Sequence, residues 1–112
     1  MRSEVWVDEP EGIAIGHDRR VPLYLYCMAA ATACRGTAYV LLPDHGDRRS
    51  TTVRFSIPVG RTRRLMPRLT SAGYRAARRG KDGGVQIEVR GVLSDPAGLR
   101  QRLFDQYYAA VR

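Results

Sequence analysis

Alternation of apolar and polar residues is the main pattern in the first 94 positions of the chain. It is clearest around Leu23, Leu25 and Cys27, which alternate with tyrosines. A period of two places every second side chain on the same face, so this stretch is predicted to be a strand with one buried face. The same period, or an apolar run bounded by turn residues, recurs further along the chain. The other predicted strands cover residues 3–7, 37–42, 51–57 and 85–93.

Two stretches carry helix signals instead. Thr70 or Ser71 can cap a short helix that ends at Gly80 and crosses between two sheets. Later, Asp95 and Pro96 are typical of the N-cap and first residue of a second helix. In that second helix, six apolar residues would fall on one side at helical spacing. They are Leu99, Leu103, Phe104, Tyr107, Tyr108 and Val111.

The spacing of the predicted strands favours a mainly β fold. Glycines and prolines are scattered as turns between short apolar runs, which is typical of a sandwich rather than a helical bundle. We expect an antiparallel β-sandwich domain over residues 1–95, with a short crossover helix, followed by an amphipathic α-helix over residues 96–112. Because the earlier strands would suffice to close the sandwich, the terminal helix either contacts a partner with its apolar face or packs back on the sheet.

The two cysteines, Cys27 and Cys34, flank the connection between two predicted strands. A hairpin brings such positions together, so we expect a disulfide that contributes roughly 2–3 kcal/mol. A disulfide implies an oxidising compartment, such as the cell exterior, a cell surface or the exterior of a virion. The cytoplasm is the alternative if the thiols stay reduced. A metal site is not expected, because no Cys-x-x-Cys pair is present.

The net charge of +8 raises the question of an anionic partner, such as nucleic acid or an acidic glycan. Heavy arginine usage throughout the chain is the competing explanation, because basic residues occur in every segment. The densest basic stretch follows Gly60. This stretch is more typical of a solvated strand face than of an anion site, since no aromatic residues interleave with its arginines to stack bases. The candidate anion-binding residues are Arg61, Arg63, Arg64, Arg68, Arg75, Arg78 and Arg79.

No arrangement of residues points to catalysis. Asp44, His45 and Asp47 share one polar loop, which is typical of solvated turn chemistry rather than of a cation site. No Ser/His/acid or Cys/His arrangement has a strand-to-helix context, and a cysteine in a disulfide cannot act as a nucleophile. We therefore expect a non-enzyme without cofactor, metal or small-molecule substrate. No apolar window has the length of a membrane span, and the first ten residues lack the apolar region of a signal peptide.

Four sequence features follow Cys27 in a particular order: CRGT at 34–37, FSIPVGRT at 55–62, LTSAG at 69–73 and VQIEV at 85–89. Together they resemble the small Ig-like β-sandwich repeats of actinobacterial surface and secreted proteins. The resemblance spans residues 19–95, about two-thirds of the chain. It implies an Ig-like fold with adhesive or structural roles and no catalytic residues. The predicted terminal helix departs from these repeats and favours a free-standing subunit.

Two functional hypotheses follow. The leading one is a structural or interaction module, a subunit that self-assembles or docks on a larger extracellular or virion-like assembly through its edges and terminal helix. The alternative is a basic domain that binds nucleic acid or acidic polysaccharide through an arginine-rich face. The second hypothesis predicts binding that weakens steeply with salt, whereas a specific protein contact survives moderate salt.

Overall fold

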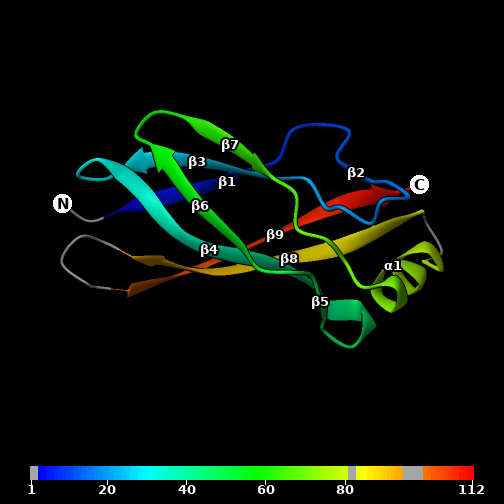
Figure 1. Ribbon diagram of the computed structural model, residues 1–112. Coiled ribbons are helices and arrows are strands. Elements are labelled where there is room, and N and C mark those ends of the chain that lie inside the picture. Colours follow the sequence, from blue (N-terminus) through cyan, green and yellow to red (C-terminus); the bar gives the residue numbers. More distant parts are fainter. Residues whose placement is uncertain (1–2, 81–82, 95–99) are drawn as a thin grey trace.

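A computed structural model describes residues 3–80, 83–94 and 100–112 of the chain. It is mainly β, as the alternation predicts (Figure 1). In chain order the elements are β1 (Glu4–Asp8), β2 (Ala14–Ile15), β3 (Leu23–Ala29), β4 (Ala33–Leu42), the 3-10 helix η1 (Pro43–His45), β5 (Arg48–Arg49), β6 (Val53–Pro58), β7 (Thr62–Leu65), α1 (Ser71–Arg78), β8 (Gly84–Ser94) and β9 (Arg100–Val111).

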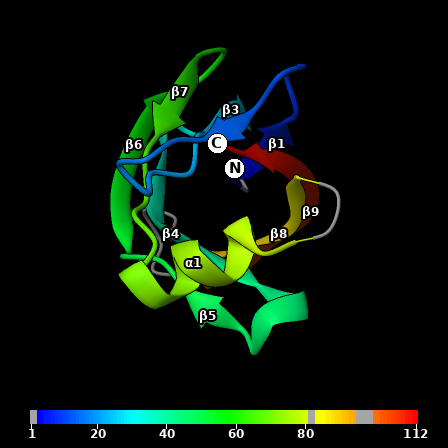
Figure 2. The same cartoon turned by 90° about the vertical axis from the view of Figure 1, so that its right-hand side faces the viewer.

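The strands form two sheets that face one another across a common core. One sheet has three strands in the order β1-β3-β7. The other has six strands in the order β2-β9-β8-β4-β5, and β6 also pairs with β4. Apart from the short parallel contact of β2 with β9, the strand pairs are antiparallel. This arrangement is compatible with a β-sandwich, and Figure 2 shows the two sheets on either side of the interior.

The core is built from the alternate positions of the strands. Val40 on β4 lies opposite Val89 on β8, and Ile87 on β8 lies opposite Tyr107 on β9. Directly paired residues point to the same face of a sheet, so these side chains all face inward. They meet Leu25 from β3 of the other sheet, and all five belong to one buried cluster.

Helix α1 confirms the predicted crossover between the sheets. It follows β7 of the three-stranded sheet and precedes β8 of the six-stranded sheet. The Thr70 hydroxyl accepts a hydrogen bond from the Gly73 backbone N–H at 3.0 Å, which caps the first turn. Tyr74 and Ala77 are buried, so this short helix is anchored to the core through one face.

The predicted disulfide between Cys27 and Cys34 is confirmed. It joins β3 to the start of β4, with 5.7 Å between the two Cα atoms. Both cysteines are fully buried within the core cluster. The predicted hairpin is wrong, because β3 and β4 lie in different sheets and do not pair. The bond therefore links the two sheets to each other.

The predicted C-terminal helix is wrong over residues 100–111, which form β9. The predicted cap residues Asp95 and Pro96 lie outside the described residues. β9 pairs with β8 along its length, from Arg100 opposite Ser94 to Ala110 opposite Gly84. The prediction failed because a spacing of four residues satisfies both a helical turn and two strand repeats. β9 lies between β8 and β2, so the terminal segment belongs to the larger sheet rather than lying outside a finished sandwich.

Candidate binding face of the six-stranded sheet

The side of the six-stranded sheet that points away from the core carries six exposed arginines. Successive side chains of a strand point to opposite faces, so the residues between the core positions form this outer face. Each arginine occupies such a position, and together they come from five strands. They are Arg35 on β4, Arg49 on β5, Arg54 on β6, Arg90 on β8, and Arg100 and Arg102 on β9.

Strand register sets these side chains in consecutive rows across the sheet. From one end, the rows are Ser56–Arg35–Ser94–Arg100, Arg54–Thr37–Val92–Arg102 and Tyr39–Arg90–Phe104. Arg49 lies opposite Leu41, one row beyond Tyr39. Strand spacing and residue rise place the three rows within an area of roughly 14 by 13 Å. Five arginines therefore share a small patch to which segments far apart in the sequence contribute.

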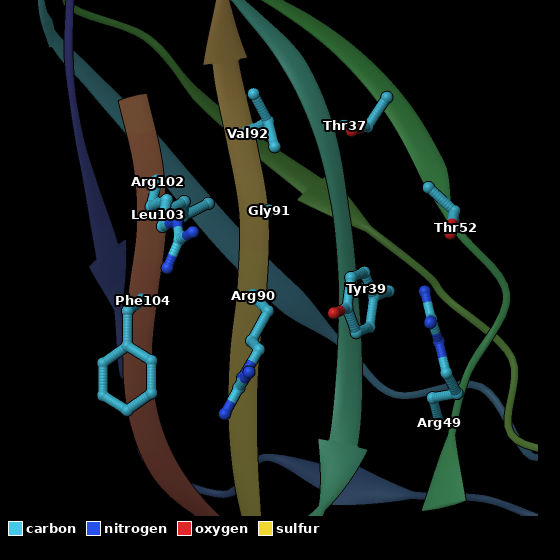
Figure 3. Close-up of a pocket in the computed structure, with 10 residues that line it drawn as sticks. All are labelled: Thr37, Tyr39, Arg49, Thr52, Arg90, Gly91, Val92, Arg102, Leu103 and Phe104. Atoms are coloured by element: carbon cyan, nitrogen blue, oxygen red, sulfur yellow. The ribbon is translucent and has the colours of Figure 1, made fainter. Parts of the chain in front are cut away.

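A shallow depression of about 660 Å³ lies over the second and third rows. Figure 3 shows its floor, formed by β9, β8 and β4 side by side. Phe104 and Arg90 lie on one side of the depression, and Tyr39 and Arg49 lie on the other. The depression is open to solvent and is lined by arginine, aromatic and threonine side chains, so it can accept an extended anionic molecule lying across the strands.

Aromatic rings hold two of the arginines in place. The guanidinium carbon of Arg49 lies 3.9 Å from the centre of the Tyr39 ring. The guanidinium carbon of Arg90 lies 5.9 Å from the centre of the Phe104 ring. Cation–π contacts of this kind restrict the side chain without neutralising its charge. Both guanidinium groups are thus positioned in advance while keeping donors available to a ligand.

Glu88 is the one carboxylate at the outward positions of the described strands in this sheet. Its side chain is only 9% exposed. It accepts hydrogen bonds from Arg90 Nε at 2.7 Å and from Gln106 Nε2 at 3.3 Å. The negative charge is therefore buried and paired, and the surface of the face stays strongly positive.

Phe104 and Tyr108 present large aromatic surfaces on the same face. Each side chain is 59% exposed, and both belong to β9. The Tyr108 ring lies over Gly84 of the neighbouring strand, because a Cβ atom at Gly84 would come within 2.3 Å of Tyr108 Cε1. An aromatic ring that covers a cross-strand glycine in this way is fixed against the sheet. Its other side remains open to solvent.

The predicted anion-binding arginines lie elsewhere. All seven are exposed, but Arg61, Arg63, Arg64 and Arg68 lie in or near β7, whereas Arg75, Arg78 and Arg79 lie in or just after α1. β7 and α1 are separated in both views of the molecule (Figures 1 and 2). None of the seven lies on the six-stranded sheet. The sequence analysis missed the six-arginine face because its members come together only through strand register.

The predicted partner-binding residues divide between the core and the surface. Leu103 and Tyr107 are buried, and Val111 is partly buried against the core, whereas Phe104 and Tyr108 are exposed. These five residues therefore do not form the single apolar face that a helix would give. The sixth, Leu99, lies outside the described residues.

Tyr107 ties β9 to the segment that leads into β3. Its hydroxyl donates a hydrogen bond to the Pro22 carbonyl oxygen at 2.8 Å. Burial raises the pKa of this phenol, and the negative charge of Glu9 acts in the same direction. Tyr107 thus serves as a neutral structural contact rather than as a surface residue.

A second exposed surface lies on the three-stranded sheet. Trp6 on β1 is 50% exposed, and Met28 on β3 is 44% exposed. Tyr26 lies directly opposite Trp6 in the strand register. The Trp6 ring nitrogen donates a hydrogen bond to Glu4 Oε1 at 3.0 Å, which fixes the indole. This face is apolar and aromatic at its centre.

Within the described part of the chain, no group of three or more His, Cys, Asp or Glu side chains is arranged to hold a metal ion. Nor does any helix there have the length and apolar character needed to cross a membrane. Comparison of the sequence with protein-family models and with curated proteins found no match. The resemblance to Ig-like repeats therefore remains an expectation, and function must be argued from the surface itself.

Proposed function

We propose that this chain is a non-enzymatic binding module that holds an acidic polymer, a nucleic acid or an acidic polysaccharide, on the outer face of its six-stranded sheet. The observation that carries the proposal is the gathering of arginines into neighbouring rows, with their single carboxylate buried and paired. Guanidinium groups bind phosphate and carboxylate in a planar, two-pronged geometry. Several such groups on one open surface suit a ligand with repeated anionic groups.

The shape of the face supports a polymer rather than a small anion. The depression is broad and open, and arginines lie on both sides of it. A long chain can contact several rows at once, since the rows lie only about 7 Å apart. A small ion would contact one or two guanidinium groups and leave the other arginines unused.

We also expect the module to work in an oxidising compartment, at the cell exterior, a cell surface or a virion exterior. The buried disulfide between Cys27 and Cys34 supports this expectation, since such bonds persist mainly outside the cytoplasm. Acidic polymers also occur in such compartments, so the location agrees with the proposed ligand.

The test is binding of labelled heparin and labelled oligonucleotides, followed by fluorescence anisotropy at several salt concentrations. We expect affinity to fall steeply between about 50 and 200 mM salt, because bound counterions are released. The double variant Arg100→Gln/Arg102→Gln should weaken binding and reduce the salt slope by about 2. Arg61→Gln/Arg64→Gln is the matched control, since it removes the same charge from β7 of the three-stranded sheet and the turn just before it.

The control variant should bind almost as tightly as the wild type. Equal losses in the two double variants would show that net charge alone drives binding, and this would contradict the proposal. A wild-type protein that binds neither heparin nor oligonucleotides at low salt would also contradict it.

The second candidate is the structural or interaction module, docking through the three-stranded sheet. The exposure of Trp6 on the edge strand β1 and of Met28 near the end of β3 favours it. Sedimentation velocity tests self-assembly: the wild type should form concentration-dependent oligomers that survive moderate salt, and Trp6→Ser should abolish them. A wild-type protein that stays monomeric at high concentration would contradict self-assembly through this face.

A further inference from the structure

We propose that the acidic polymer is a single-stranded nucleic acid, whose bases stack on Phe104 and Tyr108 while its phosphates contact the neighbouring arginines. The inference rests on the proposed function and goes further, because it names the ligand class. Sites for single strands combine a positive surface with aromatic platforms for the bases. The outer face of the six-stranded sheet has both.

The two rings are placed as platforms along one strand. Phe104 and Tyr108 are four residues apart on β9, so their Cα atoms are separated by about 13 Å. Both are 59% exposed, which leaves an open ring surface on each. The Tyr108 ring is backed by Gly84, so a base that stacks on its free side meets a rigid surface.

Arginines lie beside the first platform on two sides. Arg90 lies directly opposite Phe104 in the strand register, with its guanidinium carbon 5.9 Å from the ring centre. Arg102 precedes Phe104 by one outward position on the same strand. A base stacked on Phe104 therefore brings its flanking phosphates within reach of guanidinium groups. Tyr39, whose ring lies against the Arg49 guanidinium, extends the same pattern across the depression.

The aromatic platforms distinguish the possible polymers. A sulfated polysaccharide supplies anionic groups but no aromatic base to stack. A duplex keeps its bases stacked on one another, so a flat face reaches mainly its phosphates. Only a single strand offers phosphates and free base surfaces together. Each stacked base is worth about 1–3 kcal/mol by substitution, which corresponds to roughly 5- to 150-fold in affinity.

The central comparison is between two strands of equal charge, one with bases and one without. A labelled oligothymidylate of about 12 nucleotides is measured against an abasic phosphodiester of the same length, a duplex and a heparin oligosaccharide. We expect the oligothymidylate to bind at least tenfold more tightly than the abasic strand. Phe104→Leu and Tyr108→Leu should each remove part of this difference, because each weakens the binding of oligothymidylate more than the binding of the abasic strand.

Two further variants separate stacking from folding. Tyr108→Phe keeps the ring over Gly84 and should retain the affinity for oligothymidylate. Trp6→Leu removes an exposed aromatic residue from the other sheet and should change nothing. Circular dichroism confirms that each variant is folded before its affinity is interpreted.

The outcomes separate this inference from the proposed function. Equal affinity for the oligothymidylate and the abasic strand, with both lost in Arg100→Gln/Arg102→Gln, would overturn the inference and keep the proposed function. So would binding of the heparin oligosaccharide alone, or of the duplex more tightly than the single strand. A protein that binds none of the four ligands at low salt would overturn both.

Discussion

Neighbouring residues on β9 give a direct test of strand against helix. Leu103 is 7% exposed and Phe104 is 59% exposed, although they are adjacent in sequence and both apolar. In a strand such neighbours point to opposite faces. In the amphipathic helix that the sequence predicts, both would lie on the same apolar side. Leu103→Ala and Phe104→Ala should therefore differ strongly in their effect on the free energy of unfolding.

The surroundings of Leu103 set the size of the effect. Its cross-strand partner is Gly91, which has no side chain to fill the space left by a truncation. Buried Leu→Ala changes cost 2–5 kcal/mol, so about 3 kcal/mol is expected at this position near the sheet edge. For a domain of this size, that loss lowers Tm by about 12 °C. Phe104→Ala should cost less than about 1 kcal/mol, as is usual for exposed positions.

Urea unfolding followed by circular dichroism, under oxidising conditions that keep the disulfide closed, measures both variants. Phe104→Ala loses more strand propensity than Leu103→Ala, so a larger cost for Leu103→Ala reports burial. We expect a difference of about 2 kcal/mol or more, with Leu103→Ala the less stable. Equal costs, or a larger cost for Phe104→Ala, would refute the assignment of β9 as a strand with this register.

Three other predictions concern the core and its connections. Replacing both Cys27 and Cys34 with Ser should lower the unfolding free energy measured in urea by about 2–3 kcal/mol. Intact mass after alkylation should show no modified thiol in the native wild type, and two modified thiols after reduction. Gly91→Ala places a Cβ atom 2.2 Å from the Thr37 carbonyl oxygen and should lower the unfolding free energy by about 1–3 kcal/mol. Gly16→Ala is the control, because its Cβ atom meets only an ordinary contact at 3.5 Å and should leave stability unchanged. Equal melting temperatures of the two variants would contradict the close approach of the strands at Gly91. Because the pKa of Tyr107 is raised in the fold, its contribution to stability is present below about pH 10 and is lost as the pH rises further. Tyr107→Phe should therefore cost about 1 kcal/mol at pH 7 and flatten the decline of Tm at alkaline pH. A pH profile of Tm that is the same in the wild type and the variant would exclude this role.

Much of the fold could be predicted because it depends on local patterns. The alternation around Leu25 fixes which side of β3 faces the core, since a one-residue shift would expose every apolar side chain. The cap at Thr70 marks the start of α1 for an equally local reason, a hydroxyl that satisfies a backbone N–H. The cysteine pair was predictable because the two residues lie only seven positions apart, although their strands belong to different sheets and do not form the expected hairpin.

The last strand could not be predicted from its own residues. Leu103 and Tyr107 are four apart, as are Phe104 and Tyr108, so each pair matches both a helical turn and a strand. Pairing with β8 decides between helix and strand, because the outward residues of β8 lie opposite outward residues of β9, and the inward residues lie opposite inward ones. Such a partner is a long-range feature, and a single-sequence pattern does not contain it.

The binding face was missed for a related reason. The anion-binding residues expected from the sequence include arginines close together along the chain, such as Arg61, Arg63 and Arg64. Arg35 and Arg100 lie 65 positions apart, yet both pair with Ser94 in the same row. A signal was present, because Arg54 and Arg90 occupy polar positions of strongly alternating strands. Reading that signal requires the strand order and register, which the sequence alone does not supply.

The cost of this arrangement argues for a ligand. Like charges at neighbouring positions of one sheet face repel each other. Arg102 lies one outward position from Arg100 on β9 and diagonally across from Arg90 on β8. Glu88 and the rings of Tyr39 and Phe104 offset part of the repulsion, but they act on Arg90 and Arg49 alone. Within the described part of the chain, the other four arginines of this face form no ion pair with a carboxylate. Exposed positions of a strand need no arginine for packing. A bound polyanion would remove the repulsion and stabilise the folded state by mass action, which supports the proposed binding of an acidic polymer.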